Sequence, residues 1–282
     1  VCSSDLWNEL WKSDIIIEGD AQSQQDVHSM LYHLYSFVRE GTANSPSPMG
    51  LSGLGYNGHV FWDTELWMFP AVLQLHPEIA KSMVEYRFER LEAAKRNAFG
   101  KGYKGAMYPW ESAGTGVEET PVWALSGPFE HHITACVGIA AWNYYCVTQD
   151  KNWLHEKGYP ILSATADFWA SRVERNGNGH YDIKNVVAAD EWAENVDNNA
   201  FTNAAAKANL QFATEAAKIL GIDNITGSLE KGKDANIVIS EGDILDMKSS
   251  IVTDAFIQGR AVAITSKHKQ LYERYKHKYD IK

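Results

Sequence analysis

The chain has 282 residues, 45% of them hydrophobic and 22% charged, which is the composition of a folded globular protein. Its formal net charge of -10, with no cluster of Lys or Arg, argues against nucleic acid as a partner, and no apolar run approaches the roughly 18 residues that a membrane span needs. Three scattered cysteines without a C-x-x-C pair argue against a disulfide framework or a zinc site. We therefore expect no metal and no cofactor, and we interpret Cys2, Cys136 and Cys146 as buried thiols. The sequence begins at Val1 and leaves both the compartment and the oligomeric state open.

Apolar periodicity predicts helices separated by long loops over the first 220 residues, and no strand pair is predicted before residue 180. The clearest helix begins at Pro77 and runs to about Ala98, with Gly100 as its expected cap. The last helix stops at Gly221. Because the loops between helices are rich in Trp, Gly, Pro and Glu, we expect a catalytic face there. The predicted helices span residues 26–38, 77–98, 131–148, 160–175 and 202–220.

The composition changes near residue 221. All ten Trp lie at or before Trp192, and residues 221–282 hold ten of the 26 basic and nine of the 36 acidic side chains, which leaves sixteen and twenty-seven for the rest. Short apolar runs at 235–240 and 251–258, separated by glycines, predict strands. We therefore predict a small β-rich module over 221–265, followed by a charged tail over 266–282.

Two loops carry the residue types of a sugar-binding site, in which planar aromatic faces pack on sugar rings and carboxylates bind hydroxyls. Residues 55–67 contain two Trp, one Asp, one Glu and one His, and Trp110 and Glu111 are followed closely by Glu118 and Glu119. Composition alone favours the simpler interpretation that the Trp residues are core and the acids are solvated.

Residues 188–203 contain four carboxylates and four Asn beside Trp192 and Phe201. A general acid must keep its proton near neutral pH, and an aromatic neighbour and nearby negative charge both raise a carboxyl pKa. Glu191, which lies between Asp190 and Trp192, meets that description. The alternative is helix capping, with Thr202 or Asn203 starting the next helix.

Five stretches of the sequence resemble glycoside hydrolase family 65, in the order found in that family: residues 58–70, 103–112, 130–133, 166–173 and 190–203. The resemblance implies an (α/α)6 barrel, of which residues 7–220 would be a part. It also implies inverting cleavage of α-glucosidic bonds, by phosphorolysis in some members and by hydrolysis in others. Carried over by motif, Glu191 is the general acid, Trp62 and Asp63 hold the non-reducing glucose, and Trp110 and Glu111 line the pocket.

Inversion requires the attacking water or phosphate to approach opposite the acid, from a second site roughly 6.5 to 9.5 Å away. In the family that second site lies downstream of the acid motif, and this chain does not reach it. The sequence around Asp190 and around Glu118 resembles the hydrolase branch of the family, so we favour hydrolysis of a small α-glucoside. The alternatives are a disaccharide phosphorylase and a glucose-binding fragment without turnover, and we expect the chain alone to be inactive.

From about Ala216 to residue 265 the sequence resembles the C-terminal end of a metal-dependent amidohydrolase. The metal ligands of that family begin with a His-x-His motif, which this chain lacks, so amidohydrolase activity is the weakest alternative. The meeting of two families suggests an assembly chimera, and residues 1–6 resemble a non-native leader.

Overall fold

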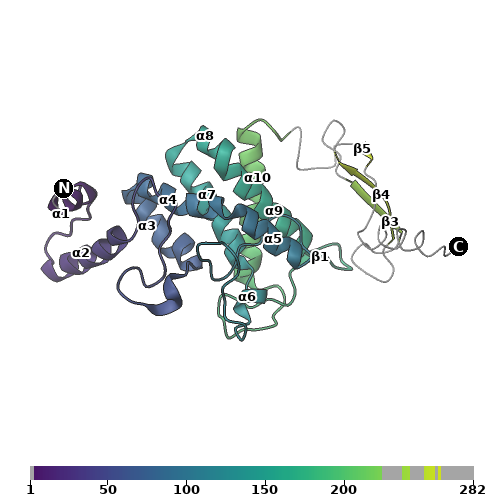
Figure 1. The fold of residues 1–282 in the computed structure, drawn as a ribbon, viewed down its shortest axis with the longest axis horizontal. Coiled ribbons are helices and arrows are strands. Elements are labelled where there is room, and N and C mark those ends of the chain that lie inside the picture. The colour runs from purple at the N-terminus through teal and green to yellow at the C-terminus, as the bar shows by residue number, and fades with distance from the viewer. Residues whose placement is uncertain (1–2, 224–236, 242–250, 258–259, 262–282) are drawn as a thin grey trace, which may run out of the picture. The chain divides into compact units, whose positions relative to one another are not determined.

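The computed structural model describes residues 3–223, 237–241, 251–257 and 260–261 (Figure 1). The chain divides into two compact units, Val1–Leu220 and Gly221–Lys282. The first unit is mainly helical. Its helices are α1 (Ser3–Leu10), α2 (Ala21–Ser36), α3 (Phe69–Leu75), α4 (Pro77–Glu89), α5 (Leu91–Gly100), α6 (Ser126–Phe129), α7 (His132–Thr148), α8 (Lys151–Trp153), α9 (Tyr159–Arg172) and α10 (Ala200–Ile219), together with the 3-10 turn η1 (Gly55–Gly58) and the π-helical turns η2 (Thr64–Met68) and η3 (Leu154–Gly158).

Helices α2, α7, α9 and α10 confirm four of the predicted helices to within a few residues. Helix α2 begins five residues earlier than predicted because the Asp20 side chain caps it, accepting hydrogen bonds from the backbone N–H groups of Gln22 and Ser23. Helix α10 ends as predicted, since Gly221 follows it with φ +67°, a conformation that a glycine adopts without strain.

The prediction of one helix over residues 77–98 is wrong, because the chain breaks at Arg90. That residue has φ -101° and ψ 8°, outside the helical region. Its guanidinium lies 3.7 Å from the centre of the Tyr86 ring, and its Nε donates to the carbonyl of Ala113 at 3.1 Å. The bend thus ties α4 to the loop after residue 110. At the end of α5 the residue with positive φ is Gly102 rather than the expected Gly100.

Helix α7 lies at the centre of the first unit and contacts α4, α9 and α10 (Figure 1). No charged Asp, Glu, Lys or Arg occurs in its seventeen residues, which explains why it is buried on several faces. It approaches α10 closely at Gly138, where a Cβ atom would lie 2.2 Å from Asn209 Nδ2. The helix ends at Thr148, and Gln149 follows in the left-handed region.

Two small sheets complete the described structure. Strands β1 (Glu174–Arg175) and β2 (Tyr181–Asp182) pair antiparallel, and their short pair spans residue 180, before which no strand pair was predicted. In the second unit β3 (Ile237–Glu241), β4 (Ile251–Ile257) and β5 (Arg260–Ala261) form an antiparallel sheet in that order. Strands β3 and β4 correspond to the two predicted strands, whereas the charged tail at 266–282 lies outside the described residues.

Two of the three cysteines lie in the described part of the chain. Cys136 is buried as expected, but Cys146 is exposed near the end of α7, so its interpretation as a buried thiol is wrong. Cys2 lies outside the described residues. No helix in the described part of the chain has the length and apolar character needed to span a bilayer.

Candidate active site

Two loops that are distant in sequence are joined backbone to backbone. Val60 and Ser112 form an antiparallel bridge, with N···O distances of 2.8 and 3.0 Å in the two directions. Ser112 also bridges to Glu118. The pairing places Trp62 and Asp63 next to the segment that carries Trp110 and Glu111.

The Glu118 side chain holds the second of these loops in shape. Its Oε2 accepts a hydrogen bond from the Trp110 N–H at 2.9 Å, and its Oε1 accepts one from the Glu111 N–H at 3.1 Å. The Thr120 hydroxyl also donates to Oε1, at 2.7 Å. Glu118 is therefore a structural residue of the loop, because its oxygens are occupied by these donors.

The loop that carries Trp62 and Asp63 is anchored to α4 by an ion pair. Glu65 in η2 and Arg87 in α4 form a buried bidentate ion pair, with Nε–Oε1 at 2.6 Å and Nη2–Oε2 at 2.9 Å. Paired and doubly hydrogen-bonded charges of this kind fix geometry in a core. The loop that carries Trp62 and Asp63 is thus held at both of its ends.

Four aromatic rings from four segments pack together, and we call Trp62, Trp110, His132 and Phe201 the aromatic wall. The Trp62 ring centre lies 4.6 Å from His132, 5.5 Å from Phe201 and 6.1 Å from Trp110. The edge-to-face angles of 68° and 74° to His132 and Phe201 are favourable for aromatic pairs. Trp62 stays partly exposed, so the wall has a face that a sugar ring can reach.

The loop carrying Glu191 is a folded hairpin, closed at its base by a bridge between Val186 and Val196. At its tip the Ala188 N–H donates to the Ala193 carbonyl at 3.1 Å. The loop is tied to the α6–α7 junction through a hydrogen bond from the Val187 N–H to the Phe129 carbonyl, at 3.2 Å. Glu191 therefore projects from an ordered turn beside the start of α7.

The asparagines after Glu191 shape the chain on its way into α10. Asn195 and Asn198 adopt φ of 52° and 54°, the left-handed region that Asn tolerates better than most residues. Asn199 caps α10, accepting a hydrogen bond at 3.0 Å from the Thr202 N–H. The expectation that Thr202 or Asn203 starts this helix is therefore wrong by a few residues, although the capping itself is real.

Glu191 lies in a group of acids. The pKa of its carboxyl is raised, first by partial burial and then by the negative charges of Asp63 and Glu111. Burial also raises the pKa of Asp63. The Glu111 carboxylate accepts a hydrogen bond from His59 Nδ1 at 2.8 Å. Glu191 thus interacts electrostatically with Asp63 and Glu111, and the other two predicted site residues, Trp62 and Trp110, belong to the aromatic wall.

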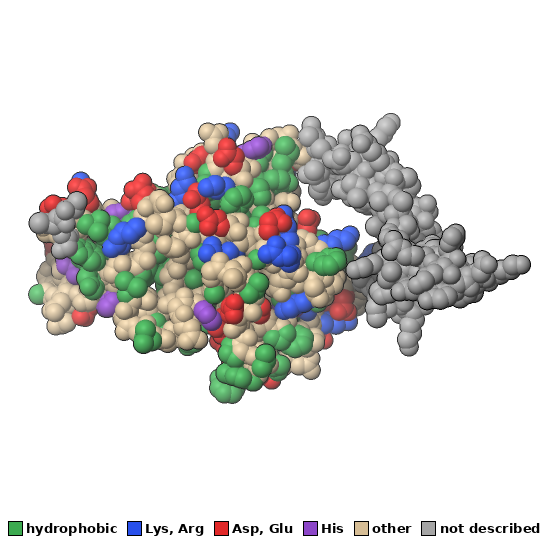
Figure 2. Space-filling model, in the orientation of Figure 1, with side chains coloured by type: hydrophobic (Ala, Val, Ile, Leu, Met, Phe, Trp, Pro, Cys, Tyr) green, Lys and Arg blue, Asp and Glu red, His purple; other side chains and the backbone are tan. Residues whose placement is uncertain are grey.

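The side chain of Glu191 is exposed and lines an open hollow of about 530 Å³ between segments 123–126 and 189–194. Trp192 is 95% exposed, so it does not shield the acid as the sequence suggested. Trp123 is also exposed, and Figure 2 shows hydrophobic side chains gathered on the surface in the region of α6. The pKa of Glu191 is raised first by the partial burial of its carboxyl and then by the negative charges of Asp63 and Glu111.

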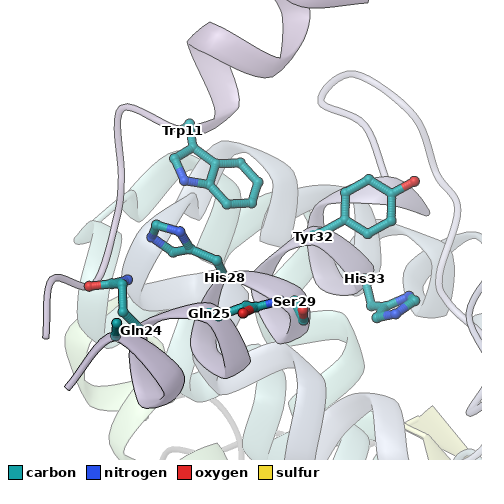
Figure 3. A pocket seen from close by; sticks show the side chains of 8 residues that line it. Trp11, Gln24, Gln25, His28, Ser29, Tyr32 and His33 are labelled. Carbon is teal, nitrogen blue, oxygen red and sulfur yellow. The ribbon is translucent and has the colours of Figure 1, made fainter.

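A second hollow, of about 470 Å³, lies over α2 and is shown in Figure 3. Trp11, His28 and Tyr32 line it together with glutamines, and no Asp or Glu is among its lining residues. It therefore lacks the acid that glycoside cleavage needs. Within the described residues, no group of three or more His, Cys, Asp and Glu is arranged to hold a metal ion.

Several residues of the site were not identified from the sequence. Glu130 and His132 belong to a quoted motif but carried no predicted role, and His59 and Phe201 carried none either. The signal in the sequence that could have identified Glu130 and His132 is the polar triplet at 130–132, because the helix that it leads into is otherwise mostly apolar. The contacts of Phe201 depend on tertiary packing and gave no local signal.

Acids grouped beside a partly exposed aromatic wall, on a helical scaffold, are the features of a carbohydrate-active site. The family model for the glycosyl hydrolase family 65 central catalytic domain matches residues 28–278. The chain therefore belongs to glycosyl hydrolase family 65. The mainly helical fold expected from the sequence, a partial (α/α)6 barrel followed by a small sheet, is confirmed.

Individual relatives agree with this family. The chain is 78% identical over 216 residues to a kojibiose hydrolase of Mucilaginibacter mallensis, covering 77% of this chain and 32% of the relative. It is 42% identical over 229 residues to a kojibiose phosphorylase of Thermoanaerobacter brockii, covering 77% and 30%. A solved structure of a putative kojibiose phosphorylase from the human microbiome is similar with a TM-score of 0.70 and 27% identity, over 77% of this chain and 32% of that one. The chain thus spans about a third of the length of these relatives.

The amidohydrolase resemblance of residues 216–265 finds no support in these comparisons. The family 65 match runs on to residue 278 and takes in the whole of that segment.

Proposed function

We propose that this chain supplies the general acid and the glucose-binding face of an enzyme that cleaves α-glucosidic bonds with inversion, with Glu191 as the acid. The observation that carries the proposal is the environment of Glu191, whose pKa is raised first by partial burial and then by the negative charges of Asp63 and Glu111. A carboxyl that keeps its proton can donate it to a leaving group. Membership of family 65 supports the same role.

The chemistry follows from this geometry. Glu191 donates its proton to the glycosidic oxygen as the bond from that oxygen to the anomeric carbon breaks. Water or phosphate forms the new bond from the opposite face, which inverts the configuration, and in hydrolysis a general base takes a proton from the attacking water. Trp62 packs against the C–H face of the glucose ring, and Asp63 accepts hydrogen bonds from its hydroxyls. Trp110 and Glu111 line the adjoining part of the pocket.

Hydrolysis is the favoured reaction, and a small disaccharide of the kojibiose type is the favoured substrate. The identity of 78% to a kojibiose hydrolase against 42% to a kojibiose phosphorylase supports this choice. Phosphorolysis is the second candidate, because a similar solved structure is described as a putative kojibiose phosphorylase.

A graft tests the proposal. The 216 residues of the Mucilaginibacter mallensis enzyme that align with this chain are replaced by the residues of this chain, and glucose release from kojibiose is measured with and without phosphate. We expect release that does not need phosphate and that falls at least 1000-fold in Glu191→Gln, while the exposed neighbour substitution Glu194→Gln has little effect. Formation of glucose 1-phosphate alone would favour the second candidate. Unchanged turnover in Glu191→Gln would remove Glu191 from the reaction.

A further inference from the structure

Glu130 and His132 form a buried pair directly behind the aromatic wall. Glu130 Oε1 lies 2.9 Å from His132 Nε2, and both side chains are fully inaccessible to solvent. Among the described residues, no Lys or Arg forms an ion pair with Glu130, and its second oxygen, Oε2, has no hydrogen-bond partner. A carboxylate charge in this position would be buried with one hydrogen bond and no cation, an unfavourable arrangement.

The other ring nitrogen indicates which form His132 takes. His132 Nδ1 lies 3.8 Å from the thiol of Cys136, one turn along α7. A neutral imidazole satisfies both contacts, with one nitrogen donating and the other accepting. An imidazolium would have to donate to both, and a thiol sulfur is a poor acceptor. The hydrogen-bond geometry therefore favours a neutral ring.

The electrostatic environment of each partner agrees with the hydrogen-bond geometry. Burial, followed by the negative charge of Glu191, raises the pKa of Glu130 to about 9. Burial lowers the pKa of His132 to about 3. Near neutral pH Glu130 is thus a protonated carboxylic acid and His132 a neutral imidazole, so the pair does not consist of two opposite charges.

The His132 ring, like that of Trp62, contacts all three other members of the aromatic wall. Its centre lies 4.6 Å from that of Trp62, 4.9 Å from Phe201 and 5.5 Å from Trp110. The hydrogen bond to Glu130 fixes the rotation of this ring, and the ring in turn supports Trp62.

We propose that Glu130 and His132 act as an uncharged hydrogen-bonded pair that positions the Trp62 face of the site and leaves proton donation to Glu191. Both are positioning residues, and neither is the acid. This inference rests on the proposed function for its purpose, but the state of the pair is tested without any sugar.

The experiment uses the full chain at pH 7 with ¹³C-labelled Glu and ¹⁵N-labelled Trp. The carboxyl signal that disappears in Glu130→Gln should have the shift of a protonated acid. Glu130→Gln, which keeps a neutral hydrogen-bonding group, should leave the Trp62 indole N–H signal, assigned with Trp62→Phe, in place. His132→Phe, which keeps the ring contacts but loses the hydrogen bond, should shift or broaden that signal. The exposed substitution Glu156→Gln is the control and should change neither signal.

A Glu130 signal with the shift of a carboxylate would overturn the uncharged pair. An unchanged Trp62 signal in His132→Phe would overturn its positioning role. A glucose titration adds the link to function: Glu130→Gln should bind within about twofold of the unmodified chain, and His132→Phe at least about tenfold more weakly. If neither the variants nor the unmodified chain bind glucose, the proposed function fails. The spectra still decide whether Glu130 and His132 are uncharged.

Discussion

At the scale of single residues, the site depends on which carboxyl groups keep their protons. Glu191, Asp63 and Glu130 all have raised pKa values, with burial as the first cause for each. Glu191 differs from Glu130 in being exposed to the hollow and in having no fixed hydrogen-bond partner among the described residues. The Glu191 carboxyl is therefore accessible to a substrate, whereas the Glu130 and His132 pair is held inside the protein.

The buried groups predict how stability depends on pH. His131 and His132 both have a pKa lowered to about 3 from 6.5, so the unfolded chain binds more protons than the folded chain below about pH 6.5, and stability falls as the pH drops from there. Glu130 has a pKa raised to about 9 from 4.5, so the folded chain binds more protons between those values and stability falls as the pH rises. Taken together, these three groups give greatest stability near pH 6.5.

Urea unfolding of the chain at pH 5, 6.5 and 8.5 measures this dependence. We expect the midpoint to be highest at pH 6.5, and we expect the loss between pH 6.5 and 8.5 to be smaller in Glu130→Gln, which cannot ionise. A loss of the same size in Glu130→Gln would show that other groups cause it.

Sequence reasoning reached the acids of the site but not their surroundings. Glu191, Asp63 and Glu111 were named from motifs, and the structure places them within electrostatic reach of one another. Trp192 was expected to shield Glu191 because it is adjacent in sequence, yet its side chain points into solvent. Adjacent residues in a tight turn point in different directions, so neighbourhood in sequence does not predict contact there. The residues that do surround Glu191 belong to loops that lie between about 60 and 130 positions earlier in the sequence.

At the scale of secondary-structure elements, the helices were predictable and their interruptions were not. Apolar periodicity indicated the stretch from Pro77 to Ala98 as one helix, because both α4 and α5 bury an apolar face. The break at Arg90 depends on the Tyr86 ring and the Ala113 carbonyl, and the latter belongs to a distant loop. Propensity and pattern contain no information about such a contact.

The cap of α10 supports both the helix and the aromatic wall. Asn199→Ala removes the hydrogen bond to the Thr202 N–H, and it should lower the free energy of unfolding by about 0.5 to 2 kcal/mol. Because Phe201 lies in the first turn and contacts Trp62, the substitution should also weaken glucose binding. Urea unfolding and calorimetric titration measure the two effects, with the exposed mid-helix substitution Lys207→Ala as the control. An Asn199→Ala variant as stable as the control would contradict the capping role.

The crossing of α7 and α10 predicts a steric effect at one glycine. In Gly138→Ala the added Cβ would lie 2.2 Å from Asn209 Nδ2 and 3.1 Å from Thr165 Oγ1, so the helices must separate or Asn209 must move. Overpacking of this kind costs about 1 to 3 kcal/mol of stability. Gly177→Ala is the matched control, because nothing lies within 4 Å of its added Cβ. Equal melting temperatures for the two variants would show that α7 and α10 are not packed this closely.

At the scale of the whole molecule, the chain spans about a third of the length of its curated relatives. Its described residues include the proposed acid, but we have assigned none of them to activate the attacking water or to bind the attacking phosphate. We expect the chain alone to bind glucose through Trp62 and Asp63 without releasing glucose from kojibiose. Calorimetric titration with glucose should show binding that weakens at least about tenfold in Trp62→Ala and Asp63→Ala, with Glu156→Gln as control. Steady glucose release by the chain alone, lost in Glu191→Gln, would prove this expectation of inactivity wrong.

The central claim is that the pKa of the Glu191 carboxyl is raised, first by partial burial and then by the negative charges of Asp63 and Glu111. A pH titration of the Glu191 carboxyl by ¹³C NMR, assigned with Glu191→Gln and repeated in Asp63→Asn, measures this on the chain itself. We predict a pKa above the ordinary 4.5 in the unmodified chain and a lower pKa once the Asp63 charge is removed. A pKa at or below 4.5 that does not respond to Asp63→Asn would contradict the claim.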